Sequence, residues 1–180
     1  IHSSGLPRHD LSWYSSSASR DELYQRMRYL EPTAELRQQF QYQNLMYMTA
    51  GILAEKVTGY SWEHLIQERI FTPLKMTRST TSGPEARQKK DYARPYGLRK
   101  GVVSPIPVRD ISALGPAGSI HSSIKDMSQW LRFNLGDGSF DEQKLLSARS
   151  IKDLQSPQMV MSSQGQGPMI PYMLYGMGWM

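Results

Sequence analysis

Apolar residues recur at intervals of three and four along much of the chain, which is the spacing that places them on one face of a helix. The strongest example runs from residue 45 to about residue 58 and ends at Gly59, where a helix C-cap belongs. Its apolar positions are Leu45, Met46, Met48, Ala50, Ile52, Leu53 and Val57. So wide an apolar surface predicts a helix that is buried deep in the core.

Similar patterns predict further helices on both sides of this segment. They span about residues 19–31, 61–72, 124–135 and 147–154. The first two begin at a serine and Ser123 directly precedes the third; serine is a residue type that is favoured as an N-cap. In the helix over residues 124–135 the expected apolar face consists of Ile124, Met127, Leu131 and Leu135.

The remaining segments lack a helical period. Residues 77–107 are rich in Ser, Thr, Gly, Pro and charge, with short extended candidates at 92–98 and 102–108, which predicts a loop over the surface. Residues 156–171 show no period, whereas residues 172–180 are typical of a strand. No run of eighteen apolar residues occurs, so neither a membrane-spanning helix nor a signal peptide is expected in this sequence.

Composition narrows the possible chemistry. The 180 residues include 21 Lys and Arg against 16 Asp and Glu, a net charge of +5, but the basic residues are scattered and nucleic-acid binding is not expected. The absence of cysteine excludes disulfides and thiolate catalysis. The four histidines fall in no metal-binding spacing, so neither a metal nor another cofactor is expected.

The stretch F-Q-Y-Q-N at residues 40–44 places Tyr42 and Asn44 directly before the most apolar helix. Both have a structural interpretation: Asn44 stands where a helix N-cap belongs, and Tyr42 would pack its ring beneath the helix with its hydroxyl at the surface. Spacing alone favours that interpretation. A catalytic one is also open, because two residues that are two apart in an extended turn point to the same side.

Six sequence blocks follow one another across nearly the whole chain. They are H-S-S-G-L-P-R-H-D (2–10), F-Q-Y-Q-N-L-M-Y (40–47), L-A-E-K-V-T-G-Y-S-W (53–62), I-F-T-P-L-K-M (70–76), G-P-A-G-S-I-H-S-S-I-K-D-M (115–127) and Y-G-M-G-W (175–179). In this order they resemble the serine β-lactamase-related family, which includes class C β-lactamases, D,D-carboxypeptidases (penicillin-binding proteins), D-aminopeptidases and esterases.

The resemblance implies an α+β fold, in which an antiparallel sheet is flanked by helices and a mainly helical domain packs against it, with the catalytic cleft between the two. Residues 1–180 would form part of such a domain, with about 10–160 as the helical subdomain and about 172–180 as the start of a strand that returns to the sheet. Neither end of the sequence reads as finished, so we expect a piece of a longer protein whose nucleophile segment and last sheet strands lie outside this chain. An extracytoplasmic location is also implied.

The family's chemistry uses S-x-x-K with the nucleophilic serine, Y-x-N, and a later K-T-G or H-x-G. Only Y-x-N matches here, at Tyr42 and Asn44. The resemblance makes Tyr42 the group that takes the serine proton and returns it to the leaving group. A tyrosine has an ordinary pKa of about 10, and a lysine ammonium beside it favours the phenolate. Asn44 would hold an amide carbonyl of the substrate and orient the lysine.

Two other segments imitate the missing elements. The run Ser122-Ser123-Ile124-Lys125 is formally S-x-x-K, but it follows Y-x-N instead of preceding it, and Ser123 is expected to cap a helix. The run K-V-T-G at residues 56–59 is one residue too long for K-T-G and ends a helix. Neither is assigned a catalytic role.

We therefore expect part of a serine hydrolase that acts through an acyl-enzyme on an amide, β-lactam or ester bond. Its partner would be a small-molecule or peptide substrate, namely a β-lactam, a D-amino acid peptide or an ester, and the isolated chain is expected to be inactive. The alternative is a non-catalytic homologue that serves as a peptidoglycan-binding, scaffolding or filament protein. The oligomeric state does not follow from the sequence.

Overall fold

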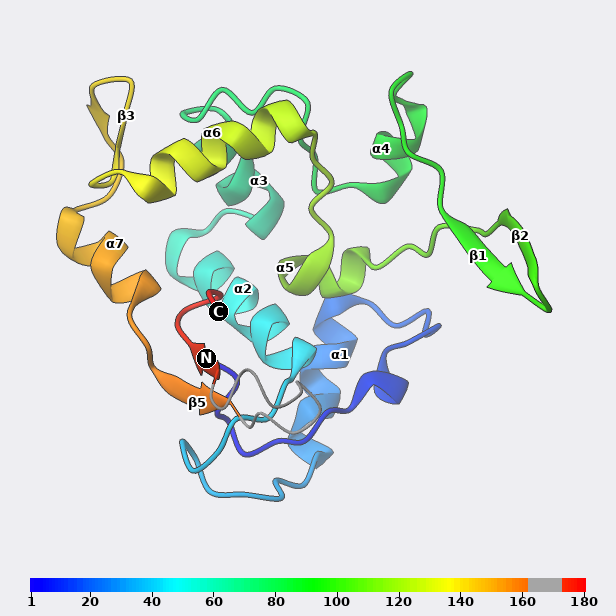
Figure 1. Ribbon diagram of the computed structural model, residues 1–180. Helices are drawn as coiled ribbons and strands as arrows, with labels where there is room; N and C mark the ends of the chain where they lie inside the picture. Colours follow the sequence, from blue (N-terminus) through cyan, green and yellow to red (C-terminus); the bar gives the residue numbers. More distant parts are fainter. Residues whose placement is uncertain (162–172) are drawn as a thin grey trace.

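The computed structural model describes residues 1–161 and 173–180 of the protein. Helix α2 (Asn44–Thr58) lies at the centre, and α1 (Arg20–Arg26) and α5 (Gly115–Gly118) both contact it (Figure 1). The segment with the widest apolar surface in the sequence is therefore the helix around which the others assemble.

Two glycines define how α2 packs and where it ends. A Cβ atom on Gly51 would lie 2.3 Å from Cγ of Pro116, so only glycine allows α5 to approach α2 this closely. Gly59 follows the last helical residue with a φ of 76°, in the left-handed region that favours glycine, and its amide donates to the carbonyl of Glu55. The predicted C-cap is confirmed.

The caps predicted for α1 and α3 are also confirmed. The side chain of Ser19 accepts a hydrogen bond from the amide of Glu22, whose carboxylate accepts one in return from the Ser19 amide, and a 3₁₀ turn (Met27–Tyr29) extends α1. Helix α3 (Trp62–Ile66) starts after a capping serine and continues as a π-helical turn (Gln67–Phe71).

Helix α6 (Ile124–Leu135) has the predicted bounds but not the predicted apolar face. Ile124, Leu131 and Leu135 are exposed, and the buried residues are Asp126, Phe133 and Asn134. The reason lies in the partners of the helix. Phe133 joins the core together with the partly buried Trp130, and the carboxylate of Asp126 turns inward to accept a hydrogen bond from the amide of Arg78.

The other described helices are short. One of them, α4, lies within residues 77–107, where an irregular loop was expected, and it begins at a serine cap. Helix α7 agrees with the helix predicted over residues 147–154. These elements are η1 (Asp10–Ser12), α4 (Gly83–Gln88), η4 (Ser112–Leu114) and α7 (Ala148–Gln155).

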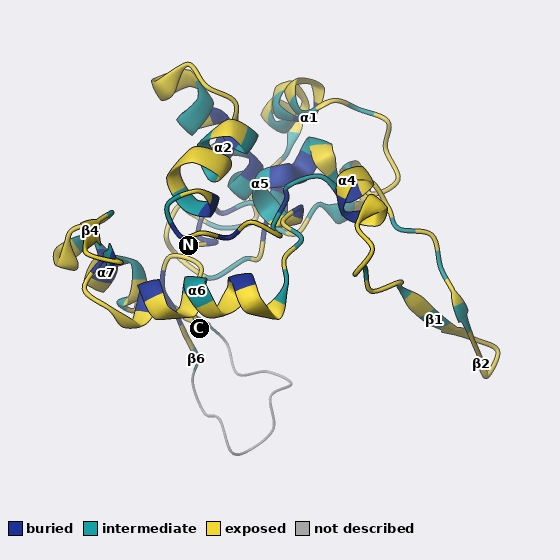
Figure 2. Ribbon diagram, turned by 90° about the horizontal axis from the view of Figure 1, so that it is seen from above, coloured by how far each residue is buried: buried dark blue, intermediate teal, exposed yellow. Residues whose placement is uncertain are grey.

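The described strands form three antiparallel pairs. The β1–β2 hairpin extends away from the helices and is mostly exposed (Figure 2). Its two strands overlap the segments 92–98 and 102–108, which were predicted to be extended. The pairs are β1 (Tyr96–Arg99) with β2 (Val102–Pro105), β3 (Ser139–Phe140) with β4 (Gln143–Lys144), and β5 (Met159–Met161) with β6 (Met173–Tyr175).

The strand predicted for residues 172–180 is confirmed only in part. Tyr172 lies outside the described residues, and β6 ends at Tyr175 because the chain then turns, with the amide of Gly176 donating to the carbonyl of Trp179. Within the described part of the chain, no helix has the length and apolar character needed to cross a membrane.

Two clusters of buried apolar side chains form the core. The first joins the segment after α3 to α6 and α7, and the second joins α1, α2 and η4. The expected deep burial of α2 is wrong for one side of the helix, because Leu53 is 62% and Val57 is 76% exposed. The elements that contact α2 cover only the side that carries Leu45, Met48 and Ile52.

Candidate active site

The stretch F-Q-Y-Q-N is built around Gln43, whose side chain is completely buried. Its Oε1 accepts a hydrogen bond from the amide of Leu45 at 3.1 Å, so Gln43 is the N-cap of α2. The expectation that Asn44 occupies the cap is wrong, and Asn44 is instead the first helical residue. The longer glutamine side chain reaches the free amide, and this leaves the carboxamide of Asn44 available for another contact.

Gln43 also fastens the N-terminal segment of the chain to the start of α2. Its Nε2 donates to the carbonyl of Pro7 at 2.6 Å and lies 3.1 Å from Nδ1 of His9, and its backbone amide donates to Nδ1 of His2 at 3.0 Å. The block at residues 2–10 and the Y-x-N block therefore meet in space. Nothing in the spacing of the sequence pointed to this role of Gln43.

Tyr42 precedes this buried residue and lies at the surface with 42% of its area exposed. Its ring packs on the ring of His2, with 4.4 Å between centroids, and the guanidinium carbon of Arg8 lies 5.0 Å from its centroid. Within residues 1–161 and 173–180 its hydroxyl has no hydrogen-bond partner. The ring is fixed on one face, while the hydroxyl remains available to a reacting group.

Asn44 follows the buried residue, and its Nδ2 donates to Oδ1 of Asp10 at 3.2 Å. The other oxygen of Asp10 forms an ion pair with Nε of Arg8, the same side chain that lies over Tyr42. The structure thus joins the two predicted residues through the pair Arg8 and Asp10. Tyr42 and Asn44 flank Gln43, whose side chain is buried, so the arrangement agrees with their lying on one shared surface.

The buried ring of His2, on which Tyr42 packs, belongs to a larger cluster of rings. His2 lies among the rings of Phe40, Tyr47 and Tyr175, and the hydroxyls of the two tyrosines are 2.8 Å apart. Burial lowers the pKa of His2, which favours the neutral imidazole. Burial and the Tyr47 contact raise the pKa of the Tyr175 phenol.

A cavity of about 900 Å³ borders this cluster. Residues from α2 line it on one side and residues of β5 and the C-terminal turn on another, including Met46, Tyr47, Ala50, Met159 and Met177. Tyr42 does not line this cavity. In the described part of the chain, no group of three or more His, Asp or Glu side chains is arranged to hold a metal ion.

The segments that imitate the missing motifs have structural roles. Ser123 caps α6, as predicted. Oγ of Ser122 lies 2.8 Å from Oγ of Ser79, which donates to the buried carboxylate of Asp126 at 2.7 Å. These contacts tie the turn before α4 to the start of α6. The run at residues 56–59 ends α2 at its glycine cap.

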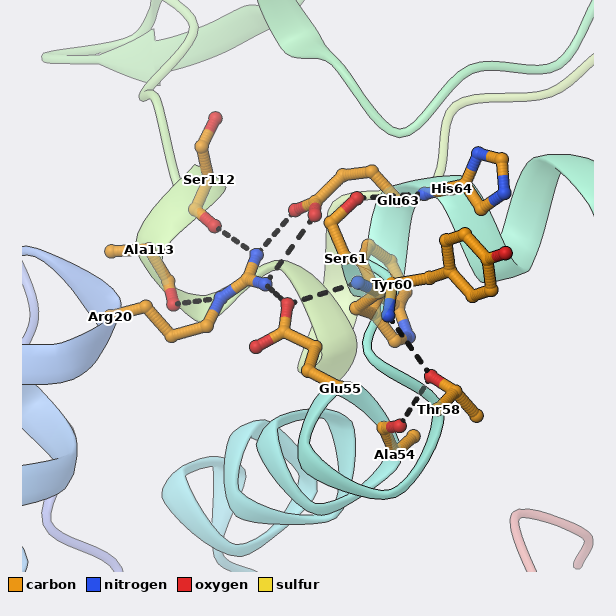
Figure 3. A network of polar contacts seen from close by, with 11 residues as sticks. Arg20, Ala54, Glu55, Thr58, Tyr60, Ser61, Glu63, His64, Ser112 and Ala113 are labelled. Atoms are coloured by element: carbon orange, nitrogen blue, oxygen red, sulfur yellow. Dashed lines mark hydrogen bonds and ion pairs between the residues drawn. The ribbon is translucent and has the colours of Figure 1, made fainter.

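A second polar cluster, which the sequence did not reveal, lies towards the other end of α2 (Figure 3). Arg20 of α1 binds Glu55 of α2 at 2.7 Å and Glu63 of α3, and it also donates to the carbonyls of Ser112 at 3.0 Å and Ala113 at 3.3 Å. All five N–H donors of the guanidinium are used. The cluster joins four elements, and the side chain of Arg20 is only 16% exposed.

Comparison with known proteins agrees with this architecture. The family model described as beta-lactamase matches residues 2–180. The octameric penicillin-binding protein homologue from Pyrococcus abyssi has a similar structure, with a TM-score of 0.80 and 25% identity over 98% of this chain and 41% of that one. The predicted α+β fold of the β-lactamase and penicillin-binding protein type is confirmed.

Curated relatives are similar over shorter stretches. The unguisins hydrolase ungD' of Aspergillus campestris is 30% identical over 136 residues, which are 72% of this chain and 26% of the relative. A beta-lactamase of Escherichia coli is 38% identical over 96 residues, 53% of this chain and 24% of the relative. The chain thus spans about a quarter of the length of these relatives. From the family model and the shared fold it follows that the chain belongs to the β-lactamase family.

Proposed function

We propose that this chain contributes the Y-x-N element of a serine hydrolase that acts through an acyl-enzyme on an amide, β-lactam or ester bond. The observation that carries the proposal is the placement of Tyr42 and Asn44 on either side of the buried Gln43. Hydrolases are also among the relatives of the chain, which supports this class of reaction.

In this proposal Tyr42 acts as the general base. A serine hydroxyl near neutral pH is a poor nucleophile, and a base within hydrogen-bond distance takes its proton as the hydroxyl oxygen attacks the substrate carbonyl. The proton then passes to the leaving group as the acyl-enzyme forms. Tyr42 suits this task, since contacts with His2 and Arg8 orient its ring while its hydroxyl has no partner among the described residues.

Asn44 has a positioning role in the same proposal. Its carboxamide offers two donors and one acceptor oxygen, and Asp10 accepts from Nδ2. Within residues 1–161 and 173–180, one donor and the oxygen of this carboxamide are left, which suffices to receive an amide carbonyl of the substrate and to accept a hydrogen bond from a lysine. The serine and the lysine of S-x-x-K, and the later K-T-G or H-x-G, would come from parts of the protein outside residues 1–180.

The experiment is intact-mass analysis of the full-length protein after incubation with a fluorophosphonate and, separately, with a β-lactam. We expect one adduct, located by peptide mapping on the serine of an S-x-x-K upstream of residue 1. Ser122→Ala should label normally, because Ser122 is held in a structural contact.

Three results would contradict the proposal. An adduct on Ser122 would show that the nucleophile is Ser122 and therefore lies within this chain. Turnover of a chromogenic β-lactam by purified residues 1–180 would show that no outside element is required. Absence of any adduct on the full-length protein would favour the non-catalytic homologue, and retention of the protein on peptidoglycan would then support a binding role.

A further inference from the structure

Arg8 is the residue that connects the two predicted site residues, and it has a charge that the proposed chemistry does not use. Its guanidinium carbon lies 5.0 Å from the centroid of the Tyr42 ring, and its Nε pairs with Asp10. Asp10 in turn holds Asn44. The backbone next to Arg8 is also fixed, because the buried Gln43 binds the carbonyl of Pro7.

The guanidinium of Arg8 is only partly engaged. A guanidinium carries five N–H donors, and Asp10 takes the one on Nε. In the part of the chain that the structure describes, the two terminal nitrogens have no hydrogen-bond partner, and the side chain is 63% exposed. These nitrogens form the end-on fork with which arginine binds a carboxylate.

Arg20 shows how different this situation is from that of a structural arginine. All the donors of Arg20 are taken by two carboxylates and two carbonyls. Arg8 instead has its Nε held by Asp10 and its guanidinium carbon over the Tyr42 ring, and these contacts orient the fork and, within the described residues, leave its terminal nitrogens free. Such an oriented, unoccupied fork beside the reacting groups is suited to a ligand.

We infer that Arg8 binds a carboxylate on the acyl part of the substrate, and that it gives the site a preference for anionic acyl groups. This inference rests on the proposed function. The acyl side follows from Asn44, which would hold an amide carbonyl of the acyl part and which Asp10 links to Arg8. The carboxylate of Asp10 offsets part of the charge of Arg8, so the preference should be moderate.

The test uses the p-nitrophenyl esters of N-acetyl-D-glutamate and N-acetyl-D-glutamine with the full-length protein. The two esters have nearly the same shape and differ in one carboxylate. We expect kcat/KM to be about tenfold higher for the glutamate ester, the factor that one charge-assisted hydrogen bond of modest strength supplies. In Arg8→Gln the ratio should fall to about one, and Arg8→Lys should retain part of it.

Arg149→Gln is the matched control, because it removes the same charge from an exposed position on α7 and should leave the ratio unchanged. An equal loss for both esters in Arg8→Gln would show a structural role for Arg8 and would overturn the inference. A ratio near one in the unaltered protein would overturn it as well. If neither ester releases p-nitrophenol although a fluorophosphonate still labels the serine, this inference is overturned and the proposed function stands. If neither ester reacts and no adduct forms, both fail.

Discussion

Two polar clusters are attached to α2, one towards each end, and they differ in how completely their groups are paired. At the C-terminal end, Arg20 uses every donor to join α1, α2, α3 and η4. At the N-terminal end, Tyr42 and Arg8 are oriented by packing and by one ion pair, yet each keeps a polar group free within the described residues.

The difference separates groups that hold the fold from groups that can receive a ligand. A saturated and partly buried network contributes to stability, and removing one member leaves its partners without compensation. An exposed hydroxyl without a partner contributes little to stability and can be replaced without loss to the fold. Mutations of the fully paired groups should therefore lower stability, whereas mutations of Tyr42 and Arg8 should change the chemistry and leave stability nearly unchanged.

The largest effect on stability is expected for Arg20→Ala. The change leaves the carboxylates of Glu55 and Glu63 next to each other without their cation, and it removes the guanidinium from the face of Trp62. We expect a loss of about 3 kcal/mol in the free energy of unfolding, measured by urea denaturation. Because both glutamates keep some contact with water, this value is at the lower end for a buried pair.

Arg26→Ala is the control for this variant, since Arg26 is an exposed arginine on the same helix. It should change the free energy of unfolding by no more than about 0.5 kcal/mol. Equal losses in the two variants would show that the Arg20 cluster is no more important than a surface charge, and the comparison would fail at that end of α2.

Gln43→Leu should have the next largest effect. Leucine is similar in size but cannot bind the amide of Leu45 or the carbonyl of Pro7, so both would be left buried without a partner. We expect the free energy of unfolding, measured by urea denaturation, to fall by about 2 kcal/mol. Gln88→Leu, at an exposed position of α4, should lose far less, and a similar loss in both would contradict the role of Gln43.

The smallest effect concerns a polar cluster that is paired but exposed. Asp137 accepts hydrogen bonds from Lys144 and Ser139, and these lower its pKa to about 2 from the ordinary value of 3.8. A carboxylate whose pKa is lower in the folded state stabilises the fold at any pH above its ordinary pKa. This contribution disappears as the pH falls from about 4 to 2. In Asp137→Asn the free energy of unfolding should therefore fall less between about pH 4 and 2 than in the original protein. An unchanged pH dependence would contradict the stabilising role of the Asp137 contacts.

Local patterns in the sequence predicted much of the fold. The Ser19 capping box, the Gly59 C-cap and the Ser123 N-cap are all formed by neighbours within a few residues, so spacing alone identifies them. The apolar faces were predicted less well. Periodicity shows which residues share a face, but it does not show which face meets a partner, and α6 and the outer side of α2 were therefore assigned wrongly.

The contacts that organise the candidate site were beyond the reach of local patterns. Gln43 meets His2 and Pro7 across more than thirty residues, and Arg20 meets Ser112 across more than ninety. Such contacts depend on how the helices pack and leave no mark in residue spacing. The roles of Tyr42 and Asn44, the division into subdomains and the extracytoplasmic location stay predictions.

The most direct test of the account is Tyr42→Phe in the full-length protein, with unfolding and acylation measured on the same preparation. Removing the hydroxyl of this exposed tyrosine should leave the free energy of unfolding within about 0.5 kcal/mol of the original. The rate of acylation by a chromogenic ester should fall by about a hundredfold or more, as expected for loss of a general base. An unchanged acylation rate, or a large loss of stability, would contradict the assignment of Tyr42 to chemistry.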